Sequence, residues 1–159
     1  MLRIEQANGP LRGSLRVPGD KSLSHRAVLF SAMAEGTSQV TGVLDAEDVR
    51  STIGVVTALG AAVELAPGAS GLEGTITGWG ASGPHSPAGP LECGNSGTTA
   101  RLVTGVLAGW PGVEATLVGD ESLSTRPMRR IVDPLSQMGA VVETTDGHLP
   151  LSVRGAALA

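Results

Sequence analysis

Residues 58–64 read ALGAAVE and residues 137–143 read QMGAVVE, so one pattern occurs twice in the chain. In each copy a helical run meets a glycine and continues as an apolar strand, which predicts the same helix-to-strand junction twice. A second match follows, because GTITG at 74–78 corresponds to LSVRG at 151–155. The copies lie about 75–80 residues apart, and self-similarity at one spacing indicates a repeated structural unit.

The segments on either side of these junctions predict two units of the order βαβαββ. Unit one is predicted to have strands at 11–17, 38–44, 62–65 and 74–78, and helices at 23–35 and from 45–48 to Gly60. Unit two is predicted to have strands at 91–93, 115–118, 140–143 and 151–155, with helices that open at 94–99 and 126–130. The expected fold class is α/β (α+β), with unit one at 11–78, a Gly/Pro-rich connecting loop at 79–90 and unit two at 91–155. Pro134 lacks an N–H inside the last helix, so we expect a kink or restart near Arg130.

The residues that carry chemistry lie where the predicted helices begin. Residues 19–26 read GDKSLSHR, which places Lys21, Ser22 and Arg26 at or beside the start of the first helix. Unpaired N–H groups and the positive end of the helix dipole favour an anion there. An ammonium, a hydroxyl and a guanidinium add donors for one phosphate or carboxylate. The alternative is a capped helix start with solvated cations.

The second unit has a matching stretch, GNSGTT at 94–99. Its glycines allow a ligand to approach the backbone, and Asn95 and Thr98 supply donors near Gly97. Taken alone, this stretch also fits a tight turn followed by a helix cap. Arg126 stands at the expected start of the last helix, a position that the dipole disfavours unless an anion lies between them.

Other residues near these motifs fit structural roles. Asp48 fits a simple helix-start acid better than a catalyst, and Cys93 fits core packing. His25 fits either a spacer or an acid–base group, and Arg101 follows the glycine stretch. Neither a P-loop sequence nor a dinucleotide-binding glycine motif is present. The motifs therefore favour small phosphorylated or carboxylated ligands.

Composition limits the possible functions. The chain has 159 residues, 41% hydrophobic residues and a mean hydropathy of +0.16, as expected for a globular protein. A net charge of −4 and aromatic residues at 2% disfavour nucleic acid and anionic membrane surfaces as partners. One cysteine and scattered histidines predict neither an internal disulfide nor a metal site. The N-terminus has no apolar signal region, so we expect a soluble cytoplasmic protein.

Three motifs resemble those of the 5-enolpyruvylshikimate-3-phosphate (EPSP) synthase family, the 3-phosphoshikimate 1-carboxyvinyltransferases. They are GDKSLSHR at 19–26, GNSGTTAR at 94–101 and GDESLSTRPM at 119–128, in the order and spacing of the family. The resemblance implies the inside-out barrel of repeated βαβαββ units, of which about two are present within 1–159. It also implies transfer of the enolpyruvyl group of phosphoenolpyruvate to the 5-hydroxyl of shikimate 3-phosphate, with release of phosphate and no cofactor or metal.

The resemblance also assigns roles by motif position. Lys21 would be catalytic and contact both substrates, and Ser22 and Arg26 would hold shikimate 3-phosphate. The phosphoenolpyruvate site would consist of Lys21, Asn95, Gly97, Thr98 and Arg126, with Asp48 and Arg101 nearby. The full-length enzyme would be a monomer.

The chain is less than half as long as a full enzyme of this family, so we expect a partial enzyme that is inactive alone. Two alternatives remain open. One is the related enolpyruvyl transferase that uses a UDP-sugar, although the motifs at 21–26 and 126–128 fit the shikimate enzyme better. The other is a fragment that binds anions without catalysis.

Overall fold

The computed structural model describes residues 9–10 and 12–159. Its helices are α1 (Lys21–Met33), α2 (Glu47–Ala58), α3 (Gly97–Ala108), α4 (Glu121–Ser124) and α5 (Arg129–Gln137), with a 3-10 helix η1 (Gly80–Ser82). Its strands are β1 (Thr37–Val43), β2 (Ala62–Gly68), β3 (Gly71–Thr77), β4 (Leu91–Glu92), β5 (Glu114–Val118), β6 (Val141–Thr145) and β7 (His148–Arg154). The fold is α/β, as the sequence predicts.

The strands form two sheets, of three and four strands, that share one three-stranded arrangement. The first has the order β1-β3-β2 and the second the order β4-β5-β7-β6, so β5, β7 and β6 repeat the arrangement of β1, β3 and β2. All pairs within these two sets of three strands are antiparallel, and equivalent apolar pairs face each other, Val63 with Ile76 and Val142 with Val153. The sequence repeat is therefore confirmed as a repeat of sheet topology.

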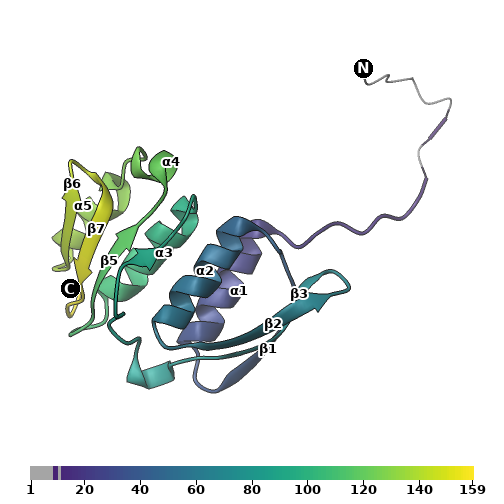
Figure 1. Ribbon diagram of the computed structural model, residues 1–159, viewed down its shortest axis with the longest axis horizontal. Coiled ribbons are helices and arrows are strands. Elements are labelled where there is room, and N and C mark those ends of the chain that lie inside the picture. The colour runs from purple at the N-terminus through teal and green to yellow at the C-terminus, as the bar shows by residue number, and fades with distance from the viewer. Residues whose placement is uncertain (1–8, 11) are drawn as a thin grey trace.

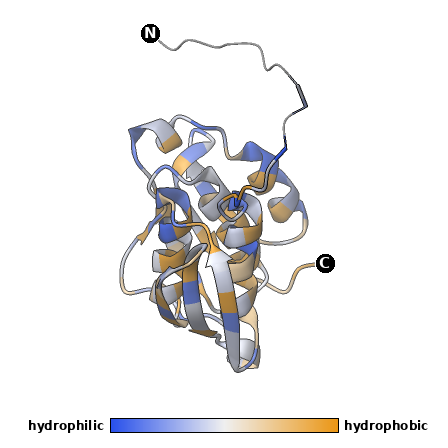
Figure 2. Ribbon diagram, turned by 90° about the vertical axis from the view of Figure 1, so that its right-hand side faces the viewer, coloured by the Kyte–Doolittle hydropathy of each residue, from blue (hydrophilic) through white to orange (hydrophobic). Residues whose placement is uncertain are grey.

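The helices α1, α2 and α3 lie between the two sheets (Figure 1). α1 packs against α2, α2 against α3, and α3 against α5. Fully buried side chains such as Val56 and Leu107 fill the space between these layers, and their burial is the main stabilising contribution. Hydrophobic and hydrophilic bands alternate along strands of the first sheet in Figure 2, because successive side chains point to opposite faces.

The strand predicted at 11–17 is wrong for residues 12–17, and Leu11 lies outside the described residues. Residues 12–17 are irregular and run away from the sheets, with Leu15 82% and Val17 67% exposed. In unit two the equivalent strand, β4, pairs in parallel with β5. An alternating pattern needs such a partner to form a strand, since backbone N–H and C=O groups must be paired.

The remaining differences concern where helices and strands begin and end. β2 ends three residues later than predicted, and β3 and β7 begin three residues earlier. α1 begins at Lys21, two residues before the predicted start, because the carboxylate of Asp20 accepts the Leu23 N–H at 2.7 Å and caps the helix. The helix α4 was not predicted. α5 begins at Arg129 and contains Pro134, and since residues 125–128 are not helical there is no earlier segment of this helix for it to restart.

Across residues 9–10 and 12–159, no helix has the length and apolar character needed to cross a membrane.

Candidate functional site

The first group of candidate residues, here the α1–α2 half-site, consists of Lys21, Ser22, Arg26 and Asp48. Lys21 is the first residue of α1, and its Nζ lies 2.9 Å from Oδ2 of Asp48 in the first turn of α2. The side chains are 54% and 30% exposed, and an ion pair this exposed contributes at most about 1 kcal/mol. Lys21 can therefore turn from Asp48 to a bound anion at little energetic cost.

Ser22 and Arg26 are exposed on α1, one helical turn apart, so their side chains share a face. Ser22 lies in the first turn, where backbone N–H groups have no partner within the helix. Lys21 is also the only lysine in the sequence. The structure thus brings Lys21 and Asp48 into contact and places Ser22 and Arg26 along the same helix.

Close packing of the backbone fixes the start of α1. A Cβ on Gly19 would lie 2.1 Å from the carbonyl oxygen of Gly42, so only glycine fits there. The Ser24 hydroxyl donates to the carbonyl of Asp20 at 2.7 Å and accepts the Leu44 N–H at 2.8 Å. These contacts hold the first turn of α1 against the end of β1.

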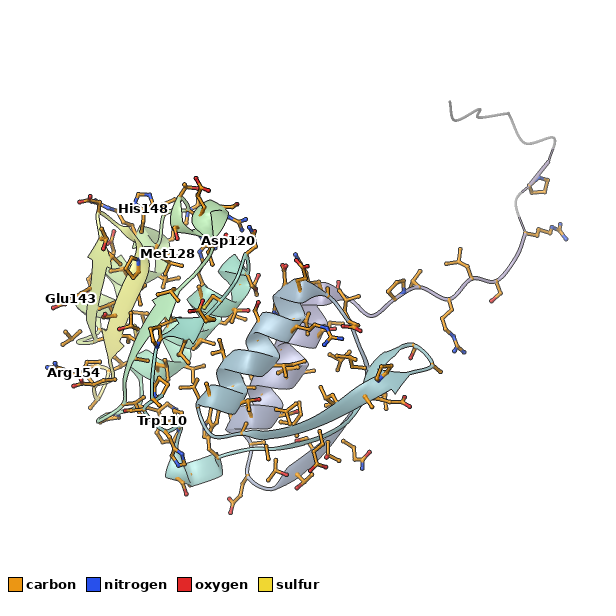
Figure 3. The ribbon with its side chains drawn as sticks, viewed as in Figure 1. Trp110, Asp120, Met128, Glu143, His148 and Arg154 are labelled. Atoms are coloured by element: carbon orange, nitrogen blue, oxygen red, sulfur yellow. The ribbon has the colours of Figure 1, made fainter. Side chains whose placement is uncertain are left out.

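The second group of candidate residues, here the α3–α4 half-site, consists of Asn95, Gly97, Thr98 and Arg126. The side-chain amide of Asn95 joins two charged residues. Its Nδ2 donates to Oδ2 of Asp120 at 2.7 Å, and its Oδ1 accepts from the guanidinium of Arg126. Arg126 also lies 3.4 Å from the Ser122 hydroxyl. Asp120 projects beside α4, near the start of α3 (Figure 3). Asn95 and Arg126 therefore come together as the motifs predict.

The charge of Asp120 is stabilised by its contacts. The backbone N–H of Leu123 donates to its carboxylate at 2.7 Å, and this bond, followed by the Asn95 amide, lowers the pKa of Asp120 below its ordinary value. Nearby Arg126 acts in the same direction. Asp120 is thus an ionised cap of α4 that also orients Asn95.

The predicted position of Arg126 needs correction. It does not lie in the first turn of a helix, because α5 begins at Arg129 and Arg126 follows the C-terminal end of α4. Its own N–H donates to the carbonyl of Leu123 at 3.0 Å. The helix dipole therefore does not oppose this cation, and the argument from an unfavourable dipole does not apply.

Gly97 and Arg101 define the start of α3. Gly97 is buried, and a Cβ there would lie 2.5 Å from Nη1 of Arg101 and 3.5 Å from Nη1 of Arg126. The guanidinium of Arg101 donates to the carbonyls of Gly97 and Pro127, each at 3.2 Å. Thr98 is exposed on the same turn. Two guanidinium groups therefore lie close to the helix start that the glycine leaves open.

A signal for α4 is present in the sequence. Residues 19–26, GDKSLSHR, and residues 119–126, GDESLSTR, share five of their first six residues, and each Asp caps the helix that follows by accepting the N–H three residues later. The first copy opens a helix of 13 residues and the second a helix of four. Pro127 follows the second copy, and a proline disfavours helical geometry in the residue before it.

Buried polar contacts connect the two half-sites. His25 Nδ1 lies 2.7 Å from Oγ1 of Thr52, which lies 2.7 Å from Oγ1 of Thr99, which in turn donates to Oγ of Ser96 at 2.7 Å. We name these four residues the buried hydroxyl chain. Sequence reasoning did not identify Thr52, Thr99 or Ser96 as a set, since their spacing along the sequence shows no pattern.

His25 is neither a surface spacer nor an exposed acid–base group. Its side chain is buried at 1% exposure, and burial lowers its pKa below the ordinary value of 6.5. Asp48 acts in the opposite direction and Lys21 in the same direction, each less strongly than burial. His25 is therefore neutral near pH 7.

The N-terminal ends of α1, α2 and α3 lie at one end of the helical layer (Figure 1). Their dipoles, together with Lys21, Arg101 and Arg126, favour a bound anion at this end. Repeated α/β units with cations close to neighbouring helix N-termini are typical of the class of proteins that bind small anions.

The chain belongs to the EPSP synthase (3-phosphoshikimate 1-carboxyvinyltransferase) family, whose sequence profile matches residues 5–159. It is 52% identical over 153 residues to a 3-phosphoshikimate 1-carboxyvinyltransferase from Xanthomonas campestris, covering 96% of this chain and 34% of that protein. An enzyme of the same name from Xylella fastidiosa is 49% identical over 156 residues, covering 98% and 34%. The structure of EPSP synthase from Acinetobacter baumannii superposes with a TM-score of 0.81 at 43% identity, covering 91% and 32%.

This chain thus spans about a third of the length of the relatives that it matches.

Proposed function

We propose that the full-length protein containing this chain transfers the enolpyruvyl group of phosphoenolpyruvate to the 5-hydroxyl of shikimate 3-phosphate and releases phosphate. The observation that supports this most directly is the placement of three cations near the N-terminal ends of α1 and α3, in a chain of the EPSP synthase family. Lys21 opens α1, and the guanidinium groups of Arg101 and Arg126 lie around Gly97 at the start of α3. Two anionic substrates repel each other, so a site that joins them needs several fixed cations. The 159-residue chain would supply part of this site and be inactive alone.

We assign the roles by half-site. In the α1–α2 half-site, Ser22 and Arg26 hold shikimate 3-phosphate, and Lys21 contacts both substrates. In the α3–α4 half-site, Asn95, Gly97, Thr98 and Arg126 hold phosphoenolpyruvate. Asp48 orients Lys21, and Arg101 adds positive charge beside Gly97. The hydrogen bond between Lys21 and Asp48 and that from Arg101 to the Gly97 carbonyl support these two roles.

The proposed reaction has two steps. The 5-hydroxyl loses its proton to a base and its oxygen bonds to C2 of phosphoenolpyruvate, while the C2=C3 electron pair takes up a proton at C3, which gives a tetrahedral intermediate. Loss of phosphate from C2 and of a proton from C3 then restores the double bond. Lys21 would polarise or protonate a reacting group, and the fixed cations would hold the anions close enough to react.

Lys21→Met tests this proposal, because it removes the ammonium and keeps the length of the side chain. The assay uses a chimera in which this chain replaces the matching third of the Xanthomonas campestris relative, and it follows phosphate release from the two substrates. We expect loss of turnover by at least about 100-fold, the range for removing one electrostatic donor. Arg50→Met is the matched control, since Arg50 is an exposed cation on α2 that pairs with Asp45. Retained activity in Lys21→Met would contradict the assignment.

The two alternative functions predict different turnover by the chimera. A UDP-sugar transferase would turn over UDP-N-acetylglucosamine in place of shikimate 3-phosphate, and we expect no such turnover. A non-catalytic anion-binding fragment would leave the chimera inactive with both acceptors. We further propose that the full-length enzyme is monomeric and cytoplasmic.

A further inference from the structure

The buried hydroxyl chain lies beneath the candidate site and crosses three helices. His25 belongs to α1, Thr52 to α2 and Thr99 to α3, while Ser96 caps α3 by accepting the Thr99 N–H at 3.2 Å. All four residues are buried, at 2% exposure or less. Polar groups so deeply buried are costly unless paired, so their contacts with one another must hold in the folded protein.

Hydroxyl groups link the members of this chain. The Oγ1 of Thr99 has one proton and is within hydrogen-bond distance of Oγ of Ser96, Oγ1 of Thr52 and the backbone carbonyl of Asp48. Nδ1 of His25 pairs with Oγ1 of Thr52, and Nε2 of His25 is buried without a hydrogen-bond partner. The chain thus begins at a ring held by a single hydrogen bond.

Each member stands beside a residue of the two half-sites. His25 precedes Arg26 and lies one turn after Lys21, and Thr52 lies one turn after Asp48. Ser96 and Thr99 flank Gly97 and Thr98. Thr99 Oγ1 also lies 3.3 Å from the backbone carbonyl of Asp48, a direct contact between α3 and α2, whose Asp48 side chain pairs with Lys21.

Apolar side chains of similar size would fill this space without the cost of burying hydroxyl groups, but they would not fix one distance between the helices. Hydrogen bonds of 2.7 Å do fix it. We propose that the buried hydroxyl chain sets the spacing between the α1–α2 and α3–α4 half-sites, so that two anions bound there meet in reactive geometry. His25, Thr52, Thr99 and Ser96 are positioning residues in this view, which rests on the proposed function.

Thr99→Val tests the proposal in the same chimera, because it removes one hydroxyl and preserves shape. Thr104→Val is the matched control. Thr104 is also fully buried on α3, but its hydroxyl donates within the helix, to the carbonyl of Ala100 at 2.7 Å. We expect Thr99→Val to lower kcat by about 10- to 100-fold, the cost of misplacing reacting groups by up to 1 Å. Binding of shikimate 3-phosphate alone, measured by calorimetry, should be unchanged, since the contacts of each half-site remain.

Two further variants separate positioning from folding. Thr99→Ser keeps the hydroxyl and should restore kcat to near that of the unsubstituted chimera. Thr52→Val and Thr99→Val should be non-additive in kcat, because either one breaks the same chain. Equal kcat values for Thr99→Val and Thr104→Val, or failure of Thr99→Ser to restore kcat, would overturn the proposal. An unsubstituted chimera without turnover would instead contradict the proposed function itself.

Discussion

At the scale of single residues, burial decides what the titratable groups can do. His25 and Cys93 are both buried and both remain neutral, but for different reasons. His25 has a lowered pKa and Cys93 a raised one, because burial disfavours whichever form carries charge. Asp120 is exposed instead, and hydrogen bonds from the Leu123 N–H and the Asn95 amide lower its pKa.

The lowered pKa of His25 predicts how stability depends on pH. The unfolded chain, with an ordinary histidine pKa of 6.5, binds the proton more readily than the folded chain does. The contribution of His25 is therefore fully present above pH 6.5 and is lost as pH falls through the lowered folded pKa. Urea midpoints of this chain between pH 8 and pH 5 measure the slope. We expect His25→Asn to flatten it, and a slope unchanged from the native chain would contradict the prediction; His148→Asn, at the half-buried start of β7, is the control.

Cys93 should not react in the folded protein. It is fully buried, and desolvation raises the pKa of its thiol to about 12, so the reactive thiolate is scarce at neutral pH. A disulfide-exchange reagent such as DTNB should label it only after denaturant is added. Rapid labelling at pH 8 without denaturant would show that the segment around β4 opens readily.

At the scale of elements, the local sequence was sufficient to predict strands with an alternating pattern and a helix with its own capping residue. Strands β1, β2 and β3 lie where alternation predicts them, and Asp20 explains the start of α1. The strand predicted at 11–17 failed over residues 12–17 because a strand also needs a neighbour, which no local pattern supplies. α4 was missed because its four residues are too few to show a period.

The candidate site also contains residues that the sequence predicted and residues that it did not. The family resemblance named which residues cluster, and the structure brings Lys21 into contact with Asp48 and Asn95 into contact with Arg126. The buried hydroxyl chain could not be predicted, since Thr52 and Thr99 resemble ordinary core-facing positions on separate helices. Their meeting depends on how α2 and α3 pack, which is a property of the tertiary structure.

The close approach of Gly19, which precedes α1, to Gly42 in β1 gives a prediction for the stability of the chain around the start of α1. Gly19→Ala would place a methyl group 2.1 Å from the Gly42 carbonyl oxygen, a backbone atom that cannot move alone. We expect a loss of about 1–3 kcal/mol of folding free energy, as for other overpacked sites, measured by urea unfolding. Gly54→Ala is the control, because Gly54 lies inside α2 with no atom within 4 Å of its added Cβ. It should stabilise the helix by about 0.5–1 kcal/mol. Equal effects of the two substitutions would show that Gly19 has no packing role.

At the scale of the whole molecule, apolar surface remains on the helical layer. Leu23 and Phe30 lie two turns apart on α1 and are 62% and 59% exposed, and Leu102 on α3 is 38% exposed. In most proteins side chains of this size are largely buried. The relatives are about three times longer than this chain, so we infer that other parts of the longer protein cover this face of α1.

The 159-residue chain studied by itself should therefore associate through α1. Burying a phenylalanine side chain contributes about 1.5–3 kcal/mol, so Phe30→Ser should raise the dissociation constant of the self-associated chain by about tenfold or more. Sedimentation velocity over a range of protein concentrations measures this constant. Met138→Ser is the control, since Met138 is 42% exposed but lies beyond the end of α5. A chain that stays monomeric at every concentration, or that dissociates equally with both substitutions, would show that the apolar face of α1 does not drive association.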